Sequence, residues 1–193
     1  MLEHLKNYHV ILASNSPRRR ELLGGLGIPF EVKVLPDVSE TYPDTLAADD
    51  TAQYIAVEKA AAYADYMQPG DLVITADTVV ICQGEVLGKP VSEADACRML
   101  RCLSGRTHHV VTGVCLTTLD RQRAFSVSTE VTFKKLSNEE INYYVTRFHP
   151  MDKAGAYGIQ EWIGYIGVTG LSGSYFNVMG LPVQRIYEEL SRF

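Results

Sequence analysis

The sequence has no long apolar run and no segment typical of export. No window approaches the run of about eighteen apolar residues that marks a membrane-spanning helix, so no such helix is expected. The opening stretch MLEHLKNYHV lacks both the apolar core and the small-residue cleavage site of a secretory signal. These absences predict a cytoplasmic protein with no membrane partner.

Several catalytic and metal-binding signatures are also missing. The sequence contains no G-x-x-x-x-G-K-[ST] phosphate loop, no G-x-S-x-G nucleophile turn and no H-E-x-x-H zinc motif. It has only four cysteines, and no pair has the C-x-x-C spacing of a zinc ribbon or a thioredoxin-type site. All four lie in apolar or mixed stretches and are expected to be reduced, buried thiols: Cys82, Cys97, Cys102 and Cys115.

The chain is short of positive charge. Its formal net charge is −5, which argues against a nucleic-acid partner, because such proteins usually present a basic surface. The length of 193 residues suits a single domain over residues 1–193 with two lobes, and the hydrophobic fraction of 46% is enough for a real core.

The periodicity of apolar residues predicts helices and strands that are interleaved along the chain. Some expected strands follow one another directly, which favours an α/β fold with a mixed sheet over a purely parallel one. Ser92 with Asp95 and Ser137 with Glu140 resemble capping boxes. Strands are expected at 8–13, 30–36, 106–118 and 123–134, in 71–90 with a polar break at Asp77–Thr78 and a turn at Gln83–Gly84, and once or twice in 148–180; helices are expected at 17–26, 51–67, 92–103, 137–147 and from Pro182 onward.

The stretch SNSPRRR predicts the start of a helix whose first turn carries arginines, although the helix dipole disfavours positive charge there. Ser16 is a good N-cap and Pro17 suits the first helical position, yet Arg18–Arg20 fill the first turn, where each cation is disfavoured by about 0.3–1 kcal/mol. Free N–H groups, serine hydroxyls and arginines together suit a multiply charged anion such as a polyphosphate. The alternative is that Arg18 and Arg20 simply point into water.

Carboxylates form a second candidate site. Asp77 follows the apolar run LVITA, where it either caps a turn or points into a ligand site at the end of a strand. Asp37, Glu40 and Asp44 lie on an acidic loop. Such hard oxygen ligands suit Mg²⁺ or Mn²⁺.

Lysines and histidines give weaker signals. Lys59, Lys89 and Lys153 are each, taken alone, typical of surface lysines. His108 and His109 are neighbours in an expected strand, so they face opposite sides and cannot easily share a metal.

Taken together, these motifs resemble the Maf family of nucleoside triphosphate pyrophosphatases. The resemblance covers nearly the whole chain in order, although each piece alone is weak. It is carried by LASNSPRRRELL (12–23), EKA (58–60), ADTVV (76–80), GEVLGKP (84–90), ML..LSGRTH (99–108), DKAGAYGIQ (152–160) and GSYFNVMGLP (173–182).

The resemblance implies a fold and an activity. The fold is an elongated mixed sheet flanked by helices with a deep cleft between two lobes, as in inosine triphosphatase-like enzymes. The reaction is metal-dependent hydrolysis of a nucleoside triphosphate between the α and β phosphates, giving the monophosphate and pyrophosphate. The family is described as removing unwanted nucleotides, was named for an effect on septum formation, and often forms homodimers.

The resemblance also assigns roles to residues. It makes Asp77 the general base, with Asp77 and Glu40 as the metal contacts. The phosphate-binding residues that it implies are Ser14, Ser16, Arg19, Lys59 and Lys89.

The branch of the family acting on dTTP and UTP carries Arg-Arg after the proline, Thr after the catalytic Asp and Gln after GAYGI. This sequence has Arg18, Thr78 and Gln160 there; Asn15, where small residues are usual, departs mildly. Three alternatives stay open: a 7-methyl-GTP pyrophosphatase, a non-catalytic nucleotide-binding regulator of septum formation, and a nucleic-acid binder suggested only by the arginine run.

Overall fold

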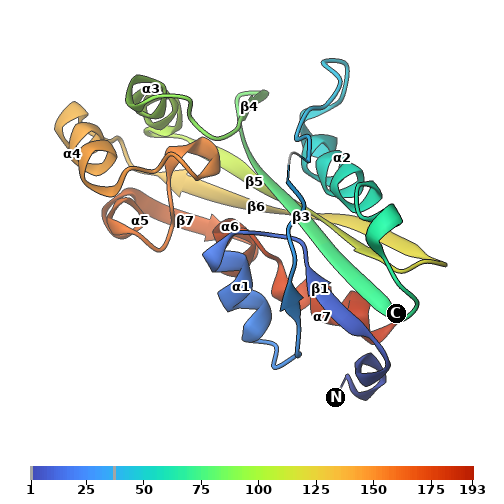
Figure 1. The fold of residues 1–193 in the computed structure, drawn as a ribbon. Helices are drawn as coiled ribbons and strands as arrows, with labels where there is room; N and C mark the ends of the chain where they lie inside the picture. Colours follow the sequence, from blue (N-terminus) through green and yellow to red (C-terminus); the bar gives the residue numbers. More distant parts are fainter. Residues whose placement is uncertain (1, 37) are drawn as a thin grey trace. The chain divides into compact units, whose positions relative to one another are not determined.

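A computed structural model describes residues 2–36 and 38–193. Its centre is a seven-stranded sheet in the order β2-β1-β3-β5-β6-β7, with β4 paired to β3 (Figure 1). β1 runs parallel to β2 and β3, whereas β4 is antiparallel to β3 and β7 to β6. The strands are β1 His9–Leu12, β2 Glu31–Val32, β3 Asp71–Cys82, β4 Glu85–Leu87, β5 Thr107–Thr117, β6 Gln122–Phe133 and β7 Val168–Ser172.

Helices alternate with these strands and confirm the expected α/β class. The α-helices are α1 Pro17–Gly24, α2 Ala48–Ala61, α3 Glu93–Leu103, α4 Asn138–Phe148, α5 Trp162–Gly167, α6 Tyr175–Met179 and α7 Val183–Ser191, with short 3₁₀ turns at Glu3–Asn7, Ala64–Tyr66 and Ala154–Ala156. Within residues 2–36 and 38–193, no helix has the length and apolar character needed to cross a membrane.

The chain divides into two compact units. The first comprises 1–77, 112–127 and 180–193, and the second comprises 78–111 and 128–179.

In the first unit, α2 packs unusually close to the sheet. Ala52, Ala56 and Ala60 recur every four residues, are buried, and give the helix a face of small side chains. The Thr75 hydroxyl on β3 donates to the Ala56 carbonyl at 2.6 Å. A Cβ atom on Gly113 would lie 2.3 Å from the backbone of Ala52, so only glycine fits there. These contacts fix the position of α2 against β3 and β5.

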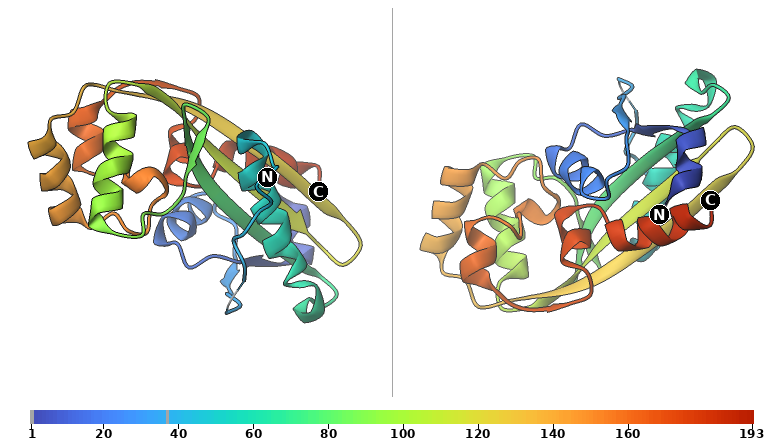
Figure 2. Two further views of the ribbon diagram at one scale, coloured as in Figure 1. Left: turned by 90° about the horizontal axis from the view of Figure 1, so that it is seen from above. Right: turned by 90° about the horizontal axis from the view of Figure 1, so that it is seen from below.

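In the second unit, α3 and α4 lie side by side (Figure 2). Both helices begin at serine N-caps, as the sequence predicts. Ser137 and Glu140 form a complete capping box, whereas the Asp95 carboxylate accepts from the Val91 N–H instead of closing the box with Ser92. The apolar faces of both helices join a core that includes Leu100, Phe133, Ile141 and Tyr144.

Several expectations need correction. β3 runs unbroken through Asp77–Thr78, because the Asp77 carboxylate is paired and therefore tolerates a buried strand position. β2 has two residues instead of seven, and α2 covers 48–61 instead of 51–67. The sequence did not predict α5 and α6 in the glycine-rich region. Gly164 permits α5 to pack there, since a Cβ atom on it would lie 1.8 Å from the Ile159 carbonyl oxygen.

Other expectations are confirmed. The turn at Gln83–Gly84 forms, with positive φ at both residues as a two-residue hairpin requires. His108 is buried and His109 is exposed. All four cysteines are free thiols, and Cys82 and Cys115 are buried as expected, whereas Cys97 and Cys102 are half-buried, which corrects the expectation of four buried thiols.

Candidate active site

The loop that enters α1 is held by its own serines. The Ser14 Oγ accepts from the Ser16 N–H at 3.2 Å, and the Ser16 Oγ accepts from the Arg19 N–H at 3.4 Å, the expected N-cap. Both hydroxyls therefore act as acceptors within the loop, and each retains a proton with which to donate. Such a loop suits an anion at the start of α1.

Arg19 explains part of the arginine run. Its Nε donates to the Gly180 carbonyl and one terminal nitrogen donates to the Ala76 carbonyl, both at 2.8 Å. Burial lowers the pKa of the guanidinium, against the opposing effect of the Asp77 and Glu40 carboxylates. Arginine keeps its charge in proteins, so Arg19 brings a fixed positive charge to the residue preceding Asp77. Arg18 is half-buried and Arg20 is exposed, as expected for Arg20.

Lys59 brings the predicted carboxylates together. Its Nζ lies 2.7 Å from the Asp77 Oδ1 and 2.8 Å from the Glu40 Oε1. Asp77 is 8% exposed, so the lysine compensates a charge that burial alone would disfavour. Lys59 is itself nearly buried, which corrects the expectation that it is a surface lysine. Glu40 lies on the loop before α2 and is about half exposed.

These two carboxylates fit a hard divalent metal. Mg²⁺ is usually held by one or two carboxylates together with substrate phosphates, and Asp77 and Glu40 converge on one cation. The residues that the structure describes contain no group of three His, Cys, Asp or Glu able to enclose a metal alone. Asp44 is exposed on the same loop, and Asp37 lies outside the described residues.

The remaining candidate residues belong to the second unit. Thr78 directly follows Asp77 in β3 and is half-buried, while Lys89 is exposed after β4. The Oε1 atom of Gln160 is buried, and no donor among the described residues reaches it. A buried acceptor that has no hydrogen-bond donor destabilises the fold by about 1–3 kcal/mol. The Gln160 carbonyl oxygen is therefore a candidate for a hydrogen bond from a ligand.

Lys153 is wrongly expected at the surface. Its side chain is only 10% exposed, and its Nζ contacts the Asp152 Oδ1 at 2.8 Å and the Glu161 Oε1 at 3.1 Å. Glu161 in turn accepts a hydrogen bond from the Tyr144 hydroxyl. The sequence reading missed Tyr144 and Glu161. Glu161 directly follows the DKAGAYGIQ motif, but nothing in the sequence connects Tyr144, on α4, with it.

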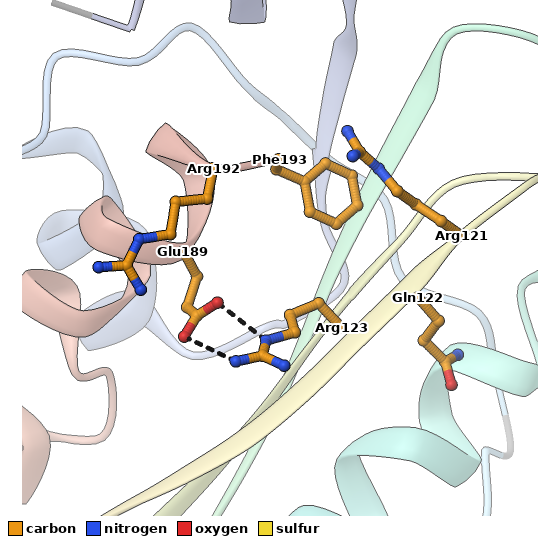
Figure 3. A pocket seen from close by; sticks show the side chains of 6 residues that line it. All are labelled: Arg121, Gln122, Arg123, Glu189, Arg192 and Phe193. Atoms are coloured by element: carbon orange, nitrogen blue, oxygen red, sulfur yellow. Dashed lines mark hydrogen bonds and ion pairs between the residues drawn. The ribbon is translucent and has the colours of Figure 1, made fainter.

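A separate pocket lies in the first unit, and none of the predicted site residues lines it. It has a volume of about 270 Å³, and Figure 3 shows that Arg123 points toward Glu189 inside it. Glu189 accepts from both Arg123 and Arg185 at 2.8–3.4 Å. This arrangement joins α7 to β6 and offsets part of the local positive charge. The lining residues are Arg121, Gln122, Arg123, Glu189, Arg192 and Phe193.

Comparisons with known proteins show which family this chain belongs to. A protein of Phocaeicola vulgatus named dTTP/UTP pyrophosphatase is 66% identical, and one of the same name from Bacteroides thetaiotaomicron is 57% identical; both matches cover all of each chain. A solved HAM1 protein from Coxiella burnetii shares the fold, with a TM-score of 0.51 at 15% identity over 96% of this chain and 100% of that one. The model of the Maf-like protein family matches residues 9–193. The chain therefore belongs to the Maf family.

Proposed function

We propose that this chain hydrolyses dTTP and UTP between the α and β phosphates, releasing the monophosphate and pyrophosphate. The relatives' names and the family membership support this reaction. The observation that carries it is the cluster of Lys59, Asp77 and Glu40, which combines a fixed cation with two carboxylates. Hydrolysis at phosphorus depends on that combination of charge neutralisation and a proton acceptor.

The phosphates would be bound mainly by the first unit. The Ser14 and Ser16 hydroxyls would donate to phosphate oxygens, and Arg19 and Lys59 would offset the negative charge. Lys59 would exchange its carboxylate contacts for phosphate oxygens as the nucleotide binds. Lys89, exposed after β4, would add a further positive charge.

Asp77 would receive the proton of the water that attacks the α-phosphorus. Only its Oδ1 is hydrogen-bonded among residues 2–36 and 38–193, so Oδ2 keeps its lone pairs available. Asp77 and Glu40 would also hold Mg²⁺ or Mn²⁺, which lowers the pKa of bound water when present. Asp77 can thus serve as base, as ligand, or as both.

Arg18, Thr78 and Gln160 would read the pyrimidine. A glutamine amide offers both a donor and an acceptor, which matches the alternating edge of uracil or thymine. The Gln160 Oε1, which accepts from no donor among the described residues, is suited to the ring N–H of those bases.

The test is pyrophosphate release over a panel of dTTP, UTP, CTP, GTP and 7-methyl-GTP, with Mg²⁺, with Mn²⁺ and with chelator. Asp77→Asn is expected to reduce turnover of dTTP at least about hundredfold. Asp71→Asn is the matched control, since Asp71 lies on the same strand, is equally buried and should leave turnover intact. Preference for 7-methyl-GTP, or tight nucleotide binding without pyrophosphate release, would contradict the proposal.

We further propose a cytoplasmic homodimer that uses neither nucleic acid nor membrane. Light scattering on the purified chain tests the dimer, since a monomer mass at micromolar concentration would refute it. A gel-shift titration at low salt tests nucleic acid, and no shift is expected for a chain with a net charge of −5.

A further inference from the structure

The hydroxyl of Tyr144 connects the two residues that bracket Gln160. Tyr144 lies on α4 and is 0% exposed. Its O–H donates to the Glu161 carboxylate, and its oxygen accepts from the Gly158 N–H at 3.0 Å. Burial, followed by the bond to Glu161, raises the pKa of this phenol, so it remains a donor at neutral pH. One buried hydroxyl therefore fixes the backbone before Gln160 and the side chain after it.

The carboxylate that Tyr144 binds is held from its other side. Glu161 Oε1 lies 3.1 Å from the Lys153 Nζ, and that ammonium also contacts Asp152 at 2.8 Å. Both oxygens of Glu161 are thus engaged by groups within the same unit. The turn that carries Gln160 is anchored by a closed polar network.

Gly158 lets this network close over the backbone. A Cβ atom there would lie 3.0 Å from the Gln160 Nε2 and 3.1 Å from both the Glu161 Cδ and the Lys153 Cε. The Gln160 amide therefore packs directly on the residue whose N–H Tyr144 holds. Its direction depends on the position of Gly158.

We propose that Tyr144 is a positioning residue for base selectivity. By holding Gly158 and Glu161, its hydroxyl keeps the turn fixed, so that the Gln160 amide packed on Gly158 presents its carbonyl oxygen, and not its NH₂ group, to the ring N–H of uracil or thymine. Cytosine carries an acceptor at that ring position and is disfavoured. The inference rests on the proposed function and extends it to a residue that does not touch the nucleotide.

Tyr144→Phe tests the inference, because it removes only the hydroxyl and keeps the buried ring. The ratio of kcat/KM for UTP to that for CTP is expected to fall about tenfold, the effect of one misaligned hydrogen bond, with most of the change in the UTP value. Calorimetric binding of non-hydrolysable UTP and CTP analogues should show the same loss. Tyr143→Phe is the matched control, since Tyr143 is a neighbouring but exposed tyrosine, and should keep the wild-type ratio.

The outcomes separate this inference from the proposed function. If the wild-type chain releases no pyrophosphate from UTP or dTTP, the proposed function fails. If the wild type prefers UTP but Tyr144→Phe keeps the UTP/CTP ratio, or loses both activities equally, only the positioning role is overturned. Should Tyr144→Phe fail to fold, Gly158→Ala replaces it: the added methyl group displaces the Gln160 amide and should lower the ratio by a similar factor, and an unchanged ratio overturns the inference.

Discussion

Lys59 and Asp77 form an ion pair, with 2.7 Å between Nζ and Oδ1. The pair forms because a hydrogen bond between α2 and β3 fixes the position of the helix along the strand. Thr75 and Asp77 lie two residues apart in the strand and face the same side. Thr75 donates to the Ala56 carbonyl, and Lys59 lies nearly one helical turn beyond Ala56. The hydrogen bond thus places the lysine directly over the carboxylate.

Replacing the lysine should affect stability as well as activity. Lys59→Met leaves the nearly buried Asp77 carboxylate without the ammonium group that contacts it directly. Breaking a buried pair costs about 3–5 kcal/mol, and the partial exposure of both side chains lowers the expected loss to about 2 kcal/mol, measured by urea unfolding at pH 7. Adding Asp77→Asn should restore most of that loss. Additive losses in the double variant would show that the pair is not the cause.

Gly113→Ala should displace α2. The new methyl group would lie 2.3 Å from the backbone of Ala52, so the helix must move away from the sheet, and Lys59 with it. We expect a destabilisation of about 1–3 kcal/mol and a fall in activity larger than the lost stability explains, seen as reduced kcat in fully folded protein. Gly88→Ala is the control, because a Cβ atom there meets nothing within 4 Å.

The sequence predicts most elements that have their own periodicity or caps. Ser137 with Glu140 predicts the start of α4 correctly, and the Gln83–Gly84 turn predicts the β3–β4 hairpin. Both features are local, because the bonding groups lie within a few residues of one another. The Ser16 N-cap that begins α1 is predicted for the same reason.

Features that depend on distant partners are not predictable in this way. The sequence predicts a break in β3 at Asp77, because the lysine that compensates the charge of its carboxylate lies eighteen residues earlier in the chain. The sequence predicts Lys153 at the surface, because only the folded turn brings its partner Glu161 within reach of the ammonium group. The sequence predicts only one or two short strands in the glycine-rich region 148–180, yet Gly164 lies within α5, where the close approach of Ile159 requires a glycine.

Glu189 should stabilise the end of the chain without affecting catalysis. Hydrogen bonding from Arg123 is the main effect lowering its pKa, and burial opposes it (Figure 3). Glu189→Ala leaves two guanidinium groups without this carboxylate. Because the arginines are partly exposed, the expected loss is about 1–2 kcal/mol by urea unfolding, with unchanged kcat/KM. Glu188→Ala, at the preceding residue, should cost far less, and equal losses would exclude the ion pairs as the cause.

His108 should make the stability of the chain depend on pH. It is 0% exposed and contacts the Tyr157 hydroxyl at 2.7 Å, and burial lowers its pKa from 6.5 to about 4. As the pH falls below about 6.5, His108 is protonated in the unfolded chain but stays neutral in the folded chain. The stabilisation is therefore complete above pH 6.5 and is lost as the pH falls toward 4, by about 3 kcal/mol in total.

Urea unfolding of His108→Gln between pH 7.5 and 4.5 isolates this contribution. Glutamine keeps a polar partner for Tyr157 but does not titrate, so the variant should lose less stability than the wild type over that range. His109→Gln is the control, since His109 is exposed on the same strand and its effect on the His108 pKa is secondary to burial. The control should follow the wild-type curve. If His108→Gln also follows it, the pH dependence arises from carboxylates elsewhere in the chain, and the neutral state of His108 contributes nothing to it.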